Sequence, residues 1–196
     1  MTGGQNLHQL PAGLPAPEDD GACDHLVGME MPAVALASTG GRTVDLAREA
    51  RGLLVLYCYP MTGRPDVPLP DGWDAIPGAR GCTPQTCAFR DHHAELRSLG
   101  AEVYGVSTQP TAYQAEMAAR LHVPFEILSD ERLDLARALR LPTMAVAGMV
   151  LLKRVTLILR SGRVERVFYP VFPPHENAGH VLAHLGAGMP PDRPRG

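Results

Sequence analysis

The sequence predicts an α/β domain: a central mixed sheet with helices on both faces. Two observations predict it. Apolar, strand-like runs alternate with stretches of helical periodicity through the middle of the chain. The chain then closes on two strand-like runs joined across Ser161-Gly162, followed by a helix. Alternation favours parallel strand pairs and the closing hairpin adds an antiparallel pair, so the sheet is expected to be mixed.

The length fits one domain with tails. The chain has 196 residues, of which 45% are hydrophobic and 20% charged, enough apolar sequence to bury a core without disulfide staples. Residues 1–24 and 186–196 are rich in Gly and Pro and lack periodicity. We therefore expect a flexible N-terminal arm over 1–24, a domain over 25–185 and a disordered tail over 186–196.

Composition argues against several classes of protein. The net charge of -3, with no basic stripe, disfavours nucleic-acid and anionic-membrane partners. No apolar run approaches the roughly 18 residues of a membrane span, and no signal peptide is visible at the N-terminus. We expect a cytoplasmic protein, where lasting disulfides are uncommon. Four cysteines are too few for a disulfide scaffold.

An N-terminal β-hairpin, a core strand and a helix make up the first half of the predicted domain. Gly40-Gly41 separates two short runs with strand character, residues 33–36 and 43–46. Residues 53–59 are continuously apolar, which is typical of a central strand covered on both faces. Apolar side chains then recur at helical spacing over residues 84–99.

The second half alternates in the same way before it closes. Its expected strands are short runs with apolar and β-branched residues, over 102–107, 125–128, 155–159 and 164–169. Asp130 is expected to cap one of its helices. Two of those helices carry apolar side chains every three or four residues, namely Tyr113, Met117 and Leu121, and Leu133, Ala136 and Leu139. A final helix is expected over residues 175–185.

The segment from Met61 to Arg80 breaks this alternation. It is rich in proline, contains the only tryptophan and has no periodicity. Loops of this length in compact domains are usually functional. Three roles are compatible with it: covering a pocket, docking a partner, or only connecting two elements.

Two cysteines follow this loop at the expected start of a helix. Thr83 is the expected N-cap and Pro84 fits the first helical position, directly after Cys82. Unpaired N–H groups and the positive end of the helix dipole stabilise a thiolate there, and the thiolate is the nucleophilic form of cysteine. Its reaction partner is an electrophilic sulfur or oxygen, such as a disulfide or a peroxide.

The spacing of Cys82 and Cys87 implies that the two cysteines act in different steps. Five residues of continuous helix give a rise of about 7.5 Å and a turn of about 500°, so the two side chains face different ways. A disulfide needs Cα atoms within about 7 Å and facing Cβ vectors. The pair cannot bond until the first turn or two of the helix unwinds.

The other two cysteines have simpler interpretations. Cys58, in an apolar strand, fits a core position, and Cys23 fits a surface thiol.

The strings Gly81-Cys82-Thr83 and Cys87-Ala88-Phe89-Arg90-Asp91 resemble the active-site helix of the peroxiredoxin Q family, also called bacterioferritin comigratory protein. The resemblance spans about residues 25–185 and includes three further segments: Tyr57-Cys58-Tyr59-Pro60, residues 103–107 and residues 121–130. It implies a thioredoxin-like fold.

The resemblance also implies roles for the site residues. Cys82 is expected to be the peroxidatic cysteine, which attacks the O–O bond and becomes a sulfenic acid, and Cys87 the resolving cysteine. Arg154 matches an arginine that the family places beside the thiolate, where it would favour the charged form and bond the peroxide. Pro60 matches the active-site proline that shields the site.

Two departures from the family pattern concern the approach to Cys82. Ala79 stands three residues before it, where the family has a threonine whose hydroxyl bonds the thiolate or the peroxide. Pro60 and Cys82 are 22 positions apart, whereas the family spans this interval in a few residues. We hypothesise that Thr62, at the other end of the inserted loop, supplies the hydroxyl. The alternative is an ordinary turn residue before Gly63.

The resemblance therefore implies a thioredoxin-dependent peroxidase. It would reduce hydrogen peroxide or organic hydroperoxides, with a Cys82–Cys87 disulfide recycled by thioredoxin or a similar dithiol. The alternative is a non-enzymatic redox sensor or binding module on the same fold. We expect a monomer or homodimer with no cofactor and no metal, since one helix cannot aim Cys82, Cys87, His92 and His93 at one zinc ion. No Cys-x-x-Cys motif supports a thioredoxin-type reductase.

Overall fold

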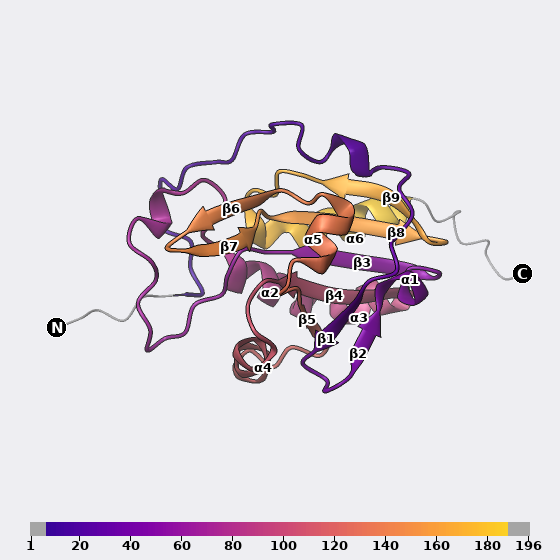
Figure 1. Cartoon of the computed structure of the whole chain (residues 1–196), viewed down its shortest axis with the longest axis horizontal. Helices are drawn as coiled ribbons and strands as arrows, with labels where there is room; N and C mark the ends of the chain where they lie inside the picture. Colours follow the sequence, from indigo (N-terminus) through magenta and orange to yellow (C-terminus); the bar gives the residue numbers. More distant parts are fainter. Residues whose placement is uncertain (1–6, 188–196) are drawn as a thin grey trace, which may run out of the picture.

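The structure is a computed structural model that describes residues 7–187, and it confirms the α/β fold with a mixed sheet (Figure 1). Seven strands lie in the order β2-β1-β5-β4-β3-β8-β9. The three central strands run parallel: β3 (Leu53–Cys58), β4 (Ala101–Ser107) and β5 (Ile127–Ser129). Antiparallel strands flank them, namely β1 (Ala35–Ser38) beside β5 and β8 (Val155–Arg160) beside β3.

Both predicted hairpins are confirmed at the edges of this sheet. β2 (Thr43–Asp45) pairs with β1, and β9 (Arg163–Phe168) pairs with β8. The structure adds a hairpin that the sequence did not predict, β6 (Thr143–Val146) with β7 (Met149–Leu152). Its two turn residues, Ala147 and Gly148, have positive φ angles of 49° and 78°. Ala-Gly lacks the Asn or Asp that usually marks such a turn, so the sequence carried no clear hairpin signal.

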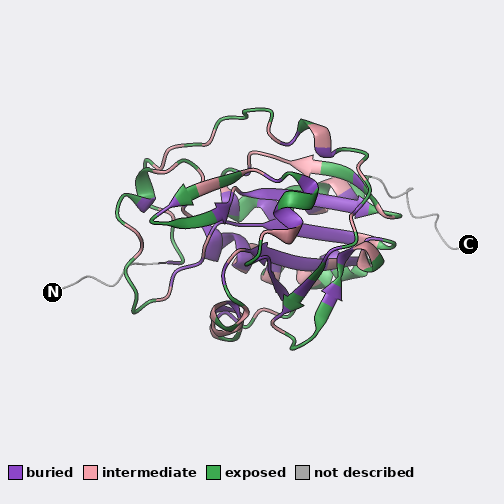
Figure 2. Ribbon diagram, viewed as in Figure 1, coloured by how far each residue is buried: buried purple, intermediate pink, exposed green. Residues whose placement is uncertain are grey.

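Helices cover both faces of the sheet (Figure 1). The side chains of β3 alternate between the two resulting cores: Leu54 and Leu56 face one core, and Val55 and Tyr57 face the other. Figure 2 shows the central strands buried along their length, whereas the β6–β7 hairpin is largely exposed. The first core also contains residues of α1 (Leu46–Glu49) and α5 (Asp134–Leu139); the second contains residues of α2 (Cys82–Asp91), α3 (His93–Ser98), α4 (Thr111–Arg120) and α6 (Asn177–Ala187).

The helix after the long loop differs from the prediction in its first residue and in its continuity. It begins at Cys82 with Gly81 as N-cap, so Thr83 is not the cap and Pro84 is the third helical residue. Proline is tolerated there because the first N–H groups of a helix have no partner within the helix. The single helix expected over 84–99 is two helices, α2 and α3, which are divided at His92 (φ -95°, ψ 4°).

Two aspartate side chains accept hydrogen bonds from the backbone N–H groups at the start of other helices. Asp130 accepts hydrogen bonds from the backbone N–H groups of Leu135 and Ala136, both at 2.9 Å, which confirms its expected capping of α5, although that helix begins four residues later, at Asp134. Asp45 caps α1, which has only four residues and too few turns to show periodicity in the sequence. Short 3₁₀ turns occupy Asp24–Leu26 (η1), Trp73–Ala75 (η2) and Pro174–Glu176 (η3).

The described part of the N-terminal arm, residues 7–24, runs along the domain (Figure 1). The Asp20 carboxylate accepts hydrogen bonds from Lys153 Nζ and Tyr169 Oη, both at 2.8 Å. These two bonds lower the pKa of Asp20 to about 2. At the other end of the chain α6 runs to Ala187, so the tail predicted over 186–196 otherwise lies outside the described residues. None of the helices in residues 7–187 is long and apolar enough to cross a membrane.

Candidate active site

Cys82 is the first residue of α2, and its position is fixed by the glycine before it. Gly81 adopts a φ of 105°, in the region that favours glycine. A Cβ atom at this position would overlap the ring of Pro174 and lie 2.9 Å from Leu10 Cδ2. The backbone therefore enters the helix through a gap in which a side chain does not fit, and this leaves Cys82 only 3% exposed.

Arg154, between β7 and β8, lies beside Cys82. Its Nη2 donates to Cys82 Sγ at 3.2 Å, and the guanidinium is 4% exposed. The same nitrogen lies 3.2–3.3 Å from the carbonyl oxygens of Gly78, Ala79 and Arg80 at the end of the long loop. The thiol of Cys82 donates to Ala79 O at 3.6 Å. The sulfur of Cys82 thus donates one hydrogen bond, to a backbone carbonyl, and accepts another, from a cation.

A buried polar network that the sequence did not reveal holds Arg154 in place. Arg154 Nη1 donates to Gln85 Oε1, and Gln85 Nε2 donates to Asn177 Oδ1 at 2.9 Å. Thr156 Oγ1 donates to the same Asn177 oxygen at 2.7 Å. Gln85 lies three residues after Cys82 on one helix, a spacing that could have indicated it. Asn177 and Thr156 are distant in sequence and carry no local signal.

The charge around Arg154 is not balanced by a carboxylate. Its hydrogen-bond acceptors are an amide oxygen, three carbonyl oxygens and the sulfur of Cys82. None of the ion pairs within residues 7–187 includes Arg154. A buried cation without a counter-ion is unfavourable. Cys82 is the ionisable side chain among the acceptors of Arg154.

Cys87 lies in the same unbroken helix as Cys82, and both thiols are free. In this conformation the geometry of the helix keeps the two cysteines apart. Cys87 is half-buried, and burial raises the pKa of its thiol. It borders an open groove of about 660 Å³ whose other lining residues are His8, Gln9, Leu10, Pro84, Ala88, Asp91, His92 and His175.

Thr62 and Pro60 are both buried near the start of the loop. The Thr62 hydroxyl donates to Gln109 Oε1 at 3.1 Å, and its backbone N–H donates to the same oxygen at 2.9 Å. The hydroxyl thus has Gln109 as its partner, and the hydrogen bonds of Cys82 are with Ala79 and Arg154. Pro60 directly follows Tyr59, a buried residue of the core that also contains Cys82. Its shielding role stays a prediction.

A small cavity adjoins Cys82. Its volume is about 10 Å³, roughly the space of one water molecule. The loop and the N-terminal arm enclose it, with Met61, Leu69, Trp73 and Leu7 among its lining residues. The space beside the sulfur is therefore smaller than an organic hydroperoxide. Within residues 7–187, no three or more His, Cys, Asp or Glu residues are placed to hold a metal ion.

The chain is similar in sequence to plant proteins named peroxiredoxin Q. The chloroplastic peroxiredoxin Q of Triticum aestivum is 28% identical over 155 residues, which are 79% of this chain and 64% of that protein. The chloroplastic peroxiredoxin Q of Arabidopsis thaliana is 28% identical over 161 residues, 82% of this chain and 67% of the relative. This chain thus spans just under two thirds of the length of the wheat protein.

Solved structures show the same fold. Peroxidoxin BcpB from Mycobacterium tuberculosis is 25% identical, with a TM-score of 0.69 over 84% of this chain and 99% of that one. A Xanthomonas campestris bacterioferritin comigratory protein, whose structures concern alkyl peroxide reduction, is 26% identical, with a TM-score of 0.64 over 81% of this chain and 96% of that one. The resemblance to peroxiredoxin Q and the thioredoxin-like fold are confirmed. The Redoxin family model matches residues 26–182, and on that match this protein belongs to the Redoxin family.

Proposed function

We propose that this protein is a thiol-dependent peroxidase, with Cys82 as the residue that reacts with peroxide. The observation that carries the proposal is the 3.2 Å hydrogen bond from Arg154 to Cys82 Sγ, in a buried site where the acceptors of Arg154 are otherwise neutral. Such a site stabilises a thiolate, the form of cysteine that attacks peroxides. The names of the peroxiredoxin Q relatives point to the same class of reaction.

In the first step the Cys82 thiolate attacks the terminal oxygen of the hydroperoxide. The S–O bond forms as the O–O bond breaks, and the departing alkoxide or hydroxide takes a proton to become alcohol or water. Cys82 is left as a sulfenic acid. Arg154 Nε is buried and has no acceptor among the described residues, so it is available to donate to an oxygen as negative charge moves onto it.

In the second step Cys87 attacks the oxidised sulfur. The S–S bond forms, the S–O bond breaks and water leaves. This step requires the first turn or two of α2 to unwind, because the intact helix keeps the cysteines apart. A thioredoxin-type dithiol then reduces the disulfide by thiol–disulfide exchange and is itself oxidised to a disulfide. The groove beside Cys87 offers an open approach to that sulfur.

Steady-state consumption of NADPH with thioredoxin, thioredoxin reductase and peroxide tests the proposal. Turnover is expected for the native protein and for Cys23→Ala, and none for Cys82→Ser. Cys87→Ser is expected to undergo the first oxidation and then stop, with over-oxidised Cys82 detected by mass spectrometry. Full activity in Cys82→Ser would contradict the proposal. One equivalent of peroxide consumed without turnover would instead favour the redox-sensor alternative.

A further inference from the structure

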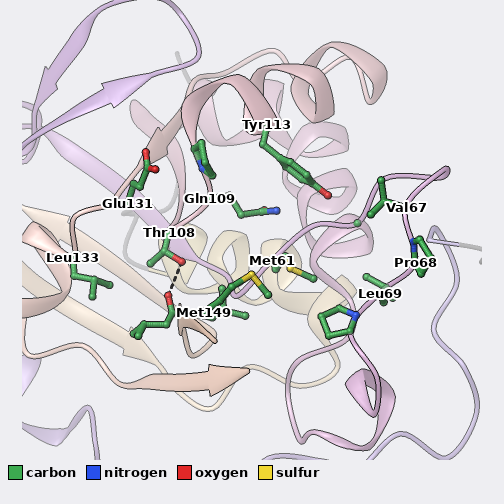
Figure 3. Close-up of a pocket in the computed structure, with 15 residues that line it drawn as sticks. Met61, Val67, Pro68, Leu69, Thr108, Gln109, Tyr113, Glu131, Leu133 and Met149 are labelled. Carbon is green, nitrogen blue, oxygen red and sulfur yellow. Dashed lines mark hydrogen bonds between the residues drawn. The ribbon is translucent and has the colours of Figure 1, made fainter. Parts of the chain in front are cut away.

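A second, much larger cavity lies beside the Cys82 site (Figure 3). Its volume of about 570 Å³ falls in the range of about 300–1,000 Å³ typical of small-molecule sites. Four parts of the chain line it. They are the long loop, with Val67, Pro68 and Leu69; the segment 108–113 that leads into α4; the segment 131–133 between β5 and α5; and the β6–β7 hairpin, with Met149. Two of these four parts are the long loop, whose role the sequence left open, and the hairpin that the sequence did not predict.

The lining of this cavity is almost entirely apolar, and much of its rim is open to solvent. Val67, Met149 and Val150 are 46%, 37% and 45% exposed. They are three of the five large hydrophobic residues that are exposed within residues 7–187, and all three line this cavity. Single exposed apolar residues are common on proteins, but a cluster of them around a cavity marks a binding site.

The few polar groups at the cavity are mostly engaged with the protein itself. The Thr108 hydroxyl donates to Val150 O at 2.9 Å, and the Tyr113 hydroxyl donates to Thr62 O at 3.1 Å. Among residues 7–187, Glu131 supplies the only carboxylate of the lining, and no Lys or Arg of this range lines the cavity. The site therefore offers apolar contact area and disfavours an anionic occupant.

The large cavity shares part of its wall with the small cavity beside the reactive sulfur. Met61, Gly63 and Leu69 line both this cavity and the small one that contains Cys82. Met61 is half-buried, and methionine has an unbranched, flexible side chain. Movement of Met61 and Leu69 would join the two spaces and bring an occupant of the larger one to within reach of Cys82 Sγ.

We propose that this cavity binds the apolar tail of an uncharged organic hydroperoxide while the peroxide group reaches Cys82. The inference deepens the proposed peroxidase function and rests on it. It assigns the loop from Met61 to Arg80 a role in substrate selection: its first half lines the tail site, and its last residues, Gly78 to Arg80, hold Arg154 through their carbonyl oxygens. The occupant is a small molecule because the cavity is lined by four segments of the chain and is of small-molecule size.

Substrate selectivity tests this assignment. The measured quantity is the ratio of kcat/KM for cumene hydroperoxide to kcat/KM for hydrogen peroxide. Val150→Glu and Val67→Glu each place a carboxylate at the exposed rim, where folding should tolerate it, and each is expected to lower the ratio at least tenfold. Val27→Glu is the matched control, because Val27 is 60% exposed and lies outside the cavity, and it should keep the native ratio.

If the ratio stays within twofold of the native value in both rim variants, the inference is overturned. The proposed function would still stand, provided that the protein turns over hydrogen peroxide. Absence of turnover with either peroxide would instead overturn the proposed function itself, and this inference with it. The two failures are therefore distinguishable in one set of assays.

Binding can be followed without turnover. Reduced protein with ¹³C-methyl methionine is titrated with 2-phenylpropan-2-ol, the alcohol product of cumene hydroperoxide. The methyl signals of Met61 and Met149 should shift, and those of Met31 and Met117, buried in the two cores away from the cavity, should not. Unchanged Met61 and Met149 signals would contradict the inference. So would shifts that depend on protein concentration, because they would indicate a second copy of the chain as the occupant.

Discussion

Arg154 donates a hydrogen bond to the sulfur of Cys82 at 3.2 Å, although 72 positions separate the two residues in the sequence. The contact depends on two elements that meet only in the fold: the start of α2 carries the sulfur, and the segment between β7 and β8 carries the guanidinium. Three backbone carbonyls of the long loop and the amide of Gln85 hold the guanidinium there. The reactivity of Cys82 should therefore respond to each of these supports.

Arg154→Lys is expected to slow the oxidation of Cys82 by hydrogen peroxide about 100-fold, the usual effect of removing one well-placed donor to a developing charge. Lysine keeps the charge but loses the planar fork that bonds Gln85 and Cys82 together. The rate can be measured by stopped-flow fluorescence of Trp73, which lines the cavity beside Cys82. Arg160→Lys, at an exposed arginine of β8, is the control. An unchanged rate in Arg154→Lys would show that the fork has no part in the reaction.

Gln85→Glu is expected to slow the alkylation of Cys82 by iodoacetamide at least tenfold at neutral pH. The new carboxylate would neutralise Arg154 and repel the negatively charged sulfur, an interaction of about 2 kcal/mol over roughly 8 Å at an effective dielectric constant of about 20. Gln85→Met removes the hydrogen bonds without adding charge and should slow the alkylation less. Equal rates in the two variants would mean that position 85 acts through packing, and thermal unfolding of both would reveal any loss of fold.

Gly81→Ala is expected to destabilise the protein by at least about 2 kcal/mol. A left-handed backbone costs a residue with a side chain roughly 1–2 kcal/mol, and the new methyl group would also collide with Pro174 and Leu10. Gly100→Ala is the matched control, because Gly100 has a φ of 80° but no atom near its missing Cβ. Urea denaturation should show a larger loss for Gly81→Ala than for Gly100→Ala. Equal losses would mean that the packing around Gly81 is easily relieved.

The four thiols should differ in their reaction with iodoacetamide at pH 8. Cys23 is buried, so its interpretation as a surface thiol was wrong, and Cys58 is buried as expected. Burial raises the pKa of Cys23 to about 12 and raises that of Cys58 still further. A raised pKa keeps a thiol protonated and unreactive until the pH approaches that value, so both should stay unmodified in the folded protein. Cys82, beside Arg154, should be labelled first, and the half-buried Cys87, whose pKa burial also raises, more slowly; denaturant should make all four reactive. Peptide mass spectrometry gives the site of each label, and rapid labelling of Cys58 in the native state would contradict this order.

Much of the fold could be predicted from the chain alone. β3 was evident as a continuous apolar run because both of its faces are covered, and the β1–β2 and β8–β9 hairpins were evident from their glycine turns. The predictions failed where the local signal was weak. The β6–β7 hairpin turns at Ala147-Gly148, and the division between α2 and α3 falls at His92, a residue with no strong helix-breaking character.

The sequence by itself determined the reactive pair, because two cysteines five residues apart at a helix start have defined geometry through local chain dimensions. It also indicated Arg154, but only through resemblance to a family. The tertiary structure alone decided the partners of that arginine, the association of Thr62 with Gln109, and the apolar cavity beside Cys82. These features join segments far apart in the chain, and such contacts depend on how sheet, loop and helices pack rather than on any periodicity within one segment.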